Sequence, residues 1–343
     1  MKSRFWALLS ALPLLFSGCT SIQYRPFGQS GQQEEYRDSV FFAMDTYITV
    51  RLATADVTET QLGEVSAECE RIVRELESVL SAHDPESELY ALNTSSEEFT
   101  GISDALESVL LTAYELSART AGAYDFTLGA LTELWNITGG GPVPRQADID
   151  AVLRHAGYEN ITIDENRNTV MRPDPKVQID LGGIGKGAAA DELIRYLETT
   201  EISYGLVSVG GTVGVFGDKP DGTPYKVGVR DPDDPNGVVT YLLIDEGFVA
   251  VSGDYERYFE EDGVRYHHIF DPSTGYPADS GLRSTAVHAL NGAAADALST
   301  ALFVMGTDAA LELYENHGGF EAVLISGDGI VQTEGAETES VKP

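Results

Sequence analysis

The stretch Val177-Gln178-Ile179-Asp180-Leu181-Gly182-Gly183-Ile184-Gly185-Lys186-Gly187 decides the fold. Its apolar start predicts a strand, and residues 188–197, which follow the glycine turn, have the pattern of a helix. A strand, a glycine turn and a helix in this order bring backbone N–H groups and a helix N-terminus to one place, where an anion can bind. Lys186 adds a positive charge. We therefore predict a phosphate site, against the alternative of a turn that needs glycine only for its backbone.

The elements on either side of this stretch predict an α+β fold. Upstream, the patterns predict a strand over residues 40–53, helices over 58–82, 103–121 and 148–156, and a strand pair over 161–171. Downstream, strands are expected over 205–216, 225–229, 239–244, 248–252, 265–270 and 284–289, before a helix over 294–305. Because hairpin-like strands and helices are interspersed, the pattern is typical of α+β proteins. We expect one globular domain over residues 39–335.

The N-terminal segment of the chain predicts export and a lipid anchor. Residues 1–18 have the charged start, short apolar run and small-residue end of a signal peptide, and Phe16-Ser17-Gly18-Cys19 resembles a bacterial lipobox. The alternative is an ordinary signal peptide with a coincidental cysteine. Acylation at Cys19 predicts a lipidated tether over residues 19–38 and places the protein on the extracytoplasmic side of the bacterial cell envelope. A flexible tail is expected over residues 336–343.

Charge narrows the possible partners. The chain has 22 Lys and Arg residues against 55 Asp and Glu residues, for a formal net charge of −33. This charge excludes nucleic acid as a partner, because phosphate backbones are bound by basic surfaces. A binder of phosphates with this composition needs a metal ion or locally placed cations.

Two adjacent histidines stand before a polar turn. His267 and His268 precede Asp271-Pro272-Ser273-Thr274-Gly275. Side chains alternate along a strand, so at most one of the two histidines can serve a given pocket. A lone histidine is usually structural, but polar turns at strand ends are also where catalytic groups collect. The pattern alone leaves both interpretations open.

Asp296 and Thr300 are one helical turn apart in the alanine-rich run 293–302. A carboxylate and a hydroxyl so placed can supply oxygen ligands to Mg²⁺. The alternative is structural: Asp296 caps the helix, and Thr300 bonds back to a carbonyl. Without further information the structural alternative is favoured.

Seven short motifs, taken in order along the chain, together resemble those of a known protein family. They are Met44-Asp45-Thr46, Ser87-Glu88-Leu89 with Leu92-Asn93, Asp125-Phe126-Thr127-Leu128-Gly129, the Asp180–Gly187 turn, Val251-Ser252-Gly253-Asp254-Tyr255-Glu256-Arg257, His268-Ile269-Phe270-Asp271-Pro272-Ser273-Thr274-Gly275 and Ala295-Asp296-Ala297-Leu298-Ser299-Thr300-Ala301. Together they resemble the ApbE-like family of FAD:protein FMN transferases, over roughly residues 41–329. The resemblance implies a two-lobed α+β fold with FAD in the cleft between the lobes.

The resemblance also implies roles for individual residues. Asp296 and Thr300 would be side-chain ligands of Mg²⁺, with the backbone carbonyl of Gly185 as a third ligand. Lys186 and the turn amides, with Gly187 among them, would hold phosphate oxygens. Asp45 departs from the Gly that many relatives carry beside the flavin ring. The other residues implied to contact FAD are Met44, Asp45, Thr46, Tyr47, Asn93, Asp125, Thr127, Ser252, Arg257, His268 and Thr274.

The implied reaction is a phosphoryl transfer. A threonine or serine hydroxyl of an acceptor protein attacks the FMN phosphorus and AMP leaves, while His268, oriented by Asp271, takes the proton. The expected acceptor is a flavoprotein of an extracytoplasmic or membrane electron-transfer system. Two alternatives stay open: an FAD pyrophosphatase that uses water instead of the acceptor, and a non-catalytic flavin-binding lipoprotein.

Overall fold

The computed structural model describes residues 36–55 and 57–341. Its largest element is an eight-stranded sheet in which each neighbouring pair of strands is antiparallel. In order across the sheet, the strands are β1 (Tyr36–Ala43), β2 (Thr46–Ala53), β6 (Gly205–Val209), β7 (Thr212–Phe216), β10 (Gly247–Gly253), β13 (Leu282–Ala289), β14 (Glu321–Ser326) and β15 (Gly329–Gln332).

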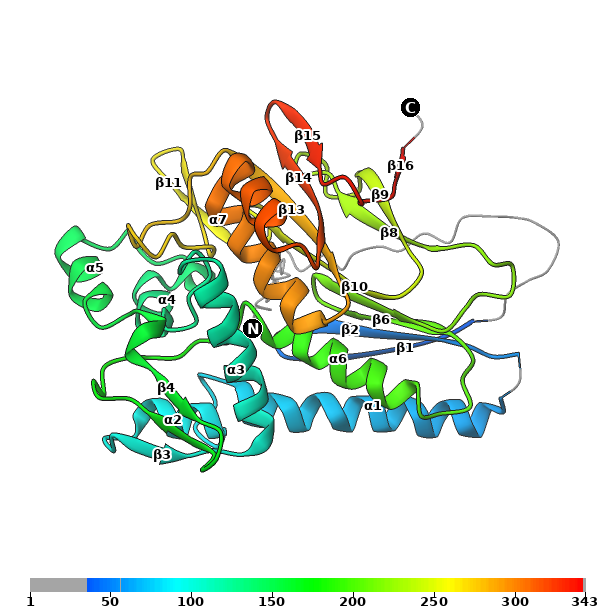
Figure 1. The fold of residues 1–343 in the computed structure, drawn as a ribbon, viewed down its shortest axis with the longest axis horizontal. Coiled ribbons are helices and arrows are strands. Elements are labelled where there is room, and N and C mark those ends of the chain that lie inside the picture. Colours follow the sequence, from blue (N-terminus) through cyan, green and yellow to red (C-terminus); the bar gives the residue numbers. More distant parts are fainter. Residues whose placement is uncertain (1–35, 56, 342–343) are drawn as a thin grey trace, which may run out of the picture.

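Both faces of this sheet are covered. Helices α1 (Glu59–Leu80), α6 (Gly185–Leu197) and α7 (Gly292–His317) form the main core with one face, to which Val207 and Val209 point. Leu206 points to the other face, as alternation along a strand requires, and packs in a second core. That second core is closed by a smaller sheet of β8 (Tyr225–Arg230), β9 (Val238–Ile244) and β16 (Thr338–Ser340). Figure 1 shows α6 and α7 beside the large sheet, with β8 and β9 on its far side.

A second lobe lies at one end of the molecule (Figure 1). It holds α2 (Glu88–Thr94), α3 (Asp104–Arg119), α4 (Gly129–Trp135), α5 (Gln146–Leu153), the short helices at Ile137–Gly139 and Tyr158–Asn160, and the sheet of β3 (Phe99–Gly101), β5 (Thr169–Met171) and β4 (Thr162–Asp164). The hairpin of β11 (Tyr258–Glu261) and β12 (Val264–His267) joins it through Trp135, whose ring packs on Tyr266 and Phe270. The predicted α+β class is confirmed.

Helix starts follow the expected chemistry. Thr58 caps α1 with a complete capping box, and Ser87 and Ser103 accept hydrogen bonds from the first turns of α2 and α3. The helices predicted over 58–82, 103–121 and 148–156 correspond to α1, α3 and α5. Short α2 and α4 were not predicted, because seven residues give too little periodicity to recognise.

Two predicted strands are hairpins instead. The run 40–53 turns at Met44 and Asp45, whose φ angles are 51° and 56°, and the run 205–216 turns at Gly210, with φ 58°. Left-handed backbone at both Met44 and Asp45 allows the tight turn that a two-residue hairpin needs. Glycine, the usual sequence signal for such a turn, is present in the second run only.

Other boundaries also differ from the prediction. The segment Val177–Leu181 is in no sheet and makes one bridge, between Gln178 and Leu128. The last predicted helix, 294–305, is the first part of α7, which continues beyond a break at Gly306.

The ends of the domain are more ordered than predicted. Tyr36–Asp38, placed in the tether, belong to β1, and the predicted flexible tail is wrong over Thr338–Ser340, which pair with β9 as β16. The rest of the tether, the signal peptide and Cys19 lie outside the described residues. Among the residues described, none of the helices has both the length and the apolar content to cross a membrane.

Candidate active site

The start of α6 and the start of α7 meet at close range. Gly185, Lys186 and Gly187 form the first turn of α6, and a side chain on Gly187 would overlap the carbonyl oxygen of Gly292. Glycine is therefore required at position 187 by the approach of another backbone. Asp191 holds the pair together, because its carboxylate accepts hydrogen bonds from the N–H groups of Gly292, at 2.7 Å, and Ala293, at 2.8 Å.

This crossing places Asp296 beside the glycine turn. The side chain of Asp296 is 3% exposed, and its Oδ2 accepts a hydrogen bond of 3.0 Å from the N–H of Gly187. The ammonium of Lys186 lies 3.6 Å from the same oxygen and donates to the carbonyl of Gly182 at 3.0 Å. Thr300 follows one turn later on α7 and is half-buried. The structure therefore brings together Lys186, Gly187, Asp296 and Thr300, as the sequence predicts.

The oxygen atoms around Asp296 suit Mg²⁺. Among the described residues no cluster of three or more His, Cys, Asp or Glu side chains could hold a metal. The carboxylate that meets the first turn of α6 is that of Asp296. The hydroxyl of Tyr124 is buried without a hydrogen-bond partner, and burial followed by the negative charge of Asp296 raises its pKa. An all-oxygen set with one carboxylate fits a hard cation that keeps several of its waters. Gly185, the third predicted ligand, is the first residue of α6.

The tip of the β1–β2 hairpin lies against this glycine turn. A side chain on Gly185 would begin 3.5 Å from Cε of Met44, and one on Gly210 would begin 3.0 Å from Cδ of Lys186 and 3.1 Å from Oγ1 of Thr46. The backbone N–H of Met44 is held by Glu77 at 2.6 Å. Asp45 is exposed, and so is Tyr47, whose ring packs on Phe42.

The two adjacent histidines differ in burial, and the strand predicted over 265–270 ends at His267, so that His268 lies in the bend that follows β12. His267 is 6% exposed; its Nε2 lies 3.1 Å from the carbonyl oxygen of Ala278, and its Nδ1 accepts from the N–H of Ile269 at 3.3 Å. His268 is half-buried, and its Nδ1 lies 3.3 Å from the carbonyl oxygen of Arg257. Loss of hydration, then the positive charges of Arg257 and Lys186, lower the pKa of His268 to about 3. His268 is therefore a neutral imidazole facing the same cations as the glycine turn.

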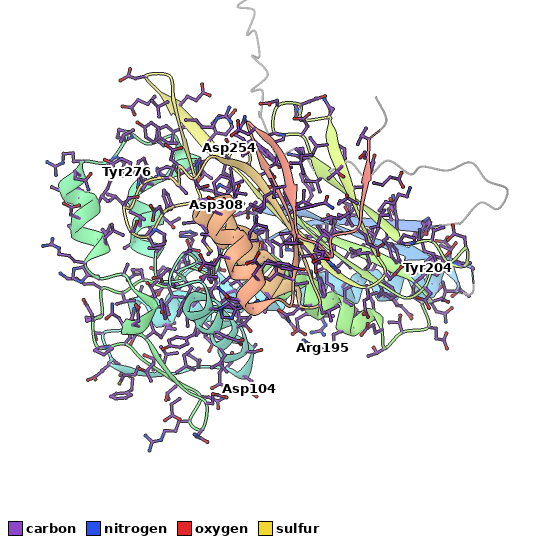
Figure 2. The ribbon with its side chains drawn as sticks, turned by 45° about the horizontal axis from the view of Figure 1, so that its top comes forward. Asp104, Arg195, Tyr204, Asp254, Tyr276 and Asp308 are labelled. Carbon is purple, nitrogen blue, oxygen red and sulfur yellow. The ribbon has the colours of Figure 1, made fainter. Side chains whose placement is uncertain are left out.

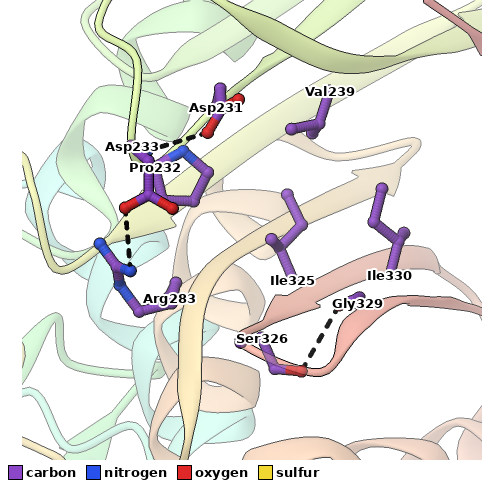
Figure 3. Close-up of a pocket in the computed structure, with 10 residues that line it drawn as sticks. Asp231, Pro232, Asp233, Val239, Arg283, Ile325, Ser326, Gly329 and Ile330 are labelled. Carbon is purple, nitrogen blue, oxygen red and sulfur yellow. Dashed lines mark hydrogen bonds and ion pairs between the residues drawn. The ribbon is translucent and has the colours of Figure 1, made fainter.

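Two cavities share Arg283 and are lined by residues other than Lys186, Asp296 and Thr300. One, of about 420 Å³, is lined by residues of the β12 region that include His267 and Arg283. The other, of about 240 Å³, lies between the β8–β9 loop and the β14–β15 hairpin, where Arg283 pairs with Asp233 (Figure 3). The candidate site is therefore marked by its charged and hydroxyl groups, and these two cavities do not mark it.

Comparisons with known proteins agree with this geometry. A family model described as the ApbE family matches residues 44–324. The chain belongs to the ApbE family. A FAD:protein FMN transferase of Vibrio cholerae is 34% identical over 260 residues, which cover 73% of this chain and 76% of that protein.

Solved ApbE structures share the fold. The ApbE protein of Thermotoga maritima has a TM-score of 0.80 at 34% identity, over 88% of this chain and 97% of that one. The apo form of the flavinyl transferase ApbE of Pseudomonas stutzeri has a TM-score of 0.74 at 29% identity, over 87% and 94% of the two chains. These neighbours confirm the predicted ApbE-like fold.

Three side chains predicted to contact FAD make hydrogen bonds within this ApbE-family chain. Asn93 is 5% exposed, and its amide exchanges two hydrogen bonds of 2.8 Å with the backbone of Ile179. The carboxylate of Asp125 accepts from Thr127 and from the N–H of Tyr158, while Thr127 accepts from the N–H of Gly157. The Asn93 contacts join the second lobe to the segment that enters the glycine turn, and the Asp125 and Thr127 contacts lie within that lobe.

The polar turn after His268 is also self-contained. Asp271 was predicted to orient His268, but its carboxylate accepts hydrogen bonds from the N–H and hydroxyl of Ser273. The hydroxyl of Thr274 accepts from the N–H of Tyr276. The orienting partner of His268 is instead the carbonyl oxygen of Arg257. The reason is local, since an Asp side chain readily caps the turn that follows it.

Two further residues belong to this region and were not predicted. They are Tyr124, described above, and Glu256, an exposed side chain whose carboxylate lies within the electrostatic reach of Lys186 and Arg230. Glu256 lies within a quoted family motif, so its position was available as a signal. Asp254, a neighbour in the same motif, is labelled in Figure 2. Arg283 holds its carboxylate at 2.7 Å and Arg265 at 3.5 Å.

Proposed function

We propose that this chain is a Mg²⁺-dependent enzyme that transfers FMN from FAD to a threonine or serine hydroxyl of an acceptor protein and releases AMP. The observation that carries the proposal is the crossing of α6 and α7, which sets Lys186 and the buried Asp296 at 3.6 Å beside a glycine turn. In a chain of net charge −33, such a site binds pyrophosphate through a cation and backbone amides.

FAD, in this proposal, lies between the two lobes with its pyrophosphate at the glycine turn. Lys186 and the N-terminal amides of α6 bind phosphate oxygens, and Met44 and Thr46 at the adjoining hairpin tip face the flavin side of the ligand. Asp296 and Thr300 hold Mg²⁺, with the carbonyl of Gly185 as a further ligand. Bound there, Mg²⁺ would supply positive charge that neutralises the pyrophosphate and stabilises AMP as the leaving group.

His268 receives the proton of the attacking hydroxyl. A carbonyl oxygen only accepts hydrogen bonds, so the contact with Arg257 places the ring proton of His268 on Nδ1 and leaves the lone pair of Nε2 free. As the acceptor oxygen bonds to the FMN phosphorus and the bond to the AMP oxygen breaks, the hydroxyl proton moves to Nε2. The negative pyrophosphate offsets Lys186 and Arg257, which raises the pKa of His268 when substrate is bound.

Purified mature protein, FAD, Mg²⁺ and a candidate acceptor domain test this function. We expect covalent flavin fluorescence on the acceptor in a denaturing gel, with one AMP released for each flavin attached. AMP release without labelling of any acceptor, including one from an electron-transfer flavoprotein, would identify a pyrophosphatase. Binding of FAD without AMP release would identify a non-catalytic flavin-binding protein.

We further propose that the enzyme is an exported lipoprotein anchored through Cys19 on the extracytoplasmic side of the cell envelope. The lipobox-like Phe16-Ser17-Gly18-Cys19 supports this location. A Cys19→Ser variant should leave the membrane fraction, while mass spectrometry should detect lipid on the wild-type N-terminus. Membrane retention of the variant, with an unmodified wild type, would contradict the anchor.

A further inference from the structure

A row of buried hydroxyl groups stands directly behind Thr300. The Oγ of Ser252, on β10, lies 3.3 Å from Oγ1 of Thr300 and 2.7 Å from Oγ of Ser299. Ser299 in turn donates a hydrogen bond of 2.8 Å to the backbone carbonyl of Asp296. Ser299 is fully buried and Ser252 is 8% exposed, so this row is shielded from solvent.

The number of protons fixes the direction of these hydrogen bonds. A hydroxyl has one proton to donate, and the carbonyl of Asp296 can only accept, so the proton of Ser299 is used there. The short contact between the two serines is then a hydrogen bond that Ser252 donates. With its proton spent on Ser299, Ser252 can only accept from Thr300. All three contacts are satisfied together in this one direction.

Thr300 therefore has its proton on the inner side. Its second possible acceptor, the carbonyl of Asp296 at 3.5 Å, lies on its own helix one turn back. When Thr300 donates its proton to Ser252 or to the carbonyl of Asp296, the lone pairs of its oxygen remain available to a ligand that accepts electron density. A cation is such a ligand, and a neutral hydroxyl binds one only through its lone pairs.

We propose that Ser252 and Ser299 are positioning residues that hold the Thr300 proton inward and so present its oxygen to the divalent cation. This inference rests on the proposed function for the identity of the cation. Ser252, predicted from the resemblance to contact FAD, acts here through Thr300. The contact of Ser252 with Ser299 ties β10 to α7, and Thr285 of β13 donates a hydrogen bond of 2.6 Å to the carbonyl of Ser299.

Removing Ser299 or Ser252 breaks the row at different points. In Ser252→Ala, Thr300 loses its nearer acceptor, on β10, and keeps only the contact of 3.5 Å with the carbonyl of Asp296, which is too long to hold the proton inward firmly. In Ser299→Ala, Ser252 loses its acceptor and is free to donate to Thr300, which turns the Thr300 proton toward the cation. Partners of metal ligands typically contribute 10–100-fold in metal affinity, so we expect each variant to bind the cation about 10-fold more weakly.

The probe is Mn²⁺, followed by the electron paramagnetic resonance signal of the free ion, with FAD present and no acceptor. The matched control is Ser117→Ala, because Ser117 is also a fully buried helical serine but its hydroxyl has no hydrogen-bond partner. We expect unchanged Mn²⁺ affinity in the control. FAD affinity in the presence of a chelator should stay at the wild-type value in all three variants, which a general loss of structure would not allow.

Wild-type Mn²⁺ affinity in folded Ser252→Ala and Ser299→Ala would overturn the inference, as would equal weakening in Ser117→Ala. If Ser299→Ala does not fold, Ser252→Ala, at the edge of the row, decides alone. These measurements need no acceptor and no turnover. A wild type that binds Mn²⁺ but labels no acceptor would refute the transferase proposal and leave the role of the serine row standing.

Discussion

The α6–α7 crossing and the Asn93–Asp125 region use similar polar residues in opposite ways. At the crossing, the carboxylate of Asp296 takes one hydrogen bond from Gly187, and the hydroxyl of Tyr124 takes none. In the second lobe, the side-chain amide of Asn93 is hydrogen-bonded to the backbone of Ile179. The carboxylate of Asp125 accepts hydrogen bonds from the backbone N–H groups of Thr127 and Tyr158. A polar residue in a family motif is therefore a candidate for ligand binding only when its polar atoms are still available.

The largest expected effect is that of Asp296→Ala. Loss of the anionic ligand removes the charge stabilisation that the cation supplies, which is several kcal/mol or roughly 10⁴-fold in rate. The measurement is the single-turnover rate of flavin transfer with FAD and Mg²⁺ saturating. Asp308→Ala is the matched control, because Asp308 is exposed on the same helix (Figure 2) and should transfer at the wild-type rate. Unchanged Mg²⁺ affinity in Asp296→Ala, measured by calorimetry with FAD bound, would refute the metal site.

Removal of the base should have the next largest effect. His268→Ala should slow transfer about 10³-fold, the middle of the usual range for general-base catalysis, with little change in FAD affinity. His267→Ala is the internal control: it loses two hydrogen bonds in the core, which should cost roughly 1–3 kcal/mol of stability and leave the chemistry intact. A dead His267 variant beside an active His268 variant would show that the base is misassigned.

Asn93→Ala should affect stability instead of catalysis. It leaves the N–H and carbonyl of Ile179 without partners in the interior, at a cost of about 1–3 kcal/mol in the free energy of unfolding. Denaturant unfolding measures this loss, and Asn166→Ala, in an exposed turn, should show none of it. A folded Asn93 variant with normal stability but weak FAD binding would place Asn93 at the ligand and break the contrast between the two regions.

The smallest expected effect is that His268 does not titrate between pH 5 and pH 8. In the free protein the pKa of His268 is lowered to about 3, far below the usual value of about 6.5, so the ring stays neutral between pH 5 and pH 8. The ring signal, assigned by its loss in His268→Ala, should not shift in an NMR titration over this range, while free histidine in the same tube does. A normal titration of His268 would show that neither loss of hydration nor the charges of Arg257 and Lys186 act on it.

Much of this structure could be predicted from local sequence, and the failures have identifiable causes. The caps Thr58, Ser87 and Ser103 lie next to the helices that they start, and the glycine turn and the Asp296–Thr300 spacing are contained in short motifs. By contrast, Asn93 bonds a residue 86 positions away. No periodicity in the sequence marks such a contact. The hairpin at Met44 and Asp45 escaped prediction because its left-handed residues are not glycine.

The most direct test follows covalent labelling of one acceptor domain by mass spectrometry during a single turnover, with wild type, Asn93→Ala and Asp296→Ala compared as folded protein under identical FAD and Mg²⁺. If the chemistry resides at the α6–α7 crossing, wild type and Asn93→Ala should both add FMN at similar rates, and Asp296→Ala should add none on that timescale. Labelling by Asp296→Ala at the wild-type rate would contradict the account.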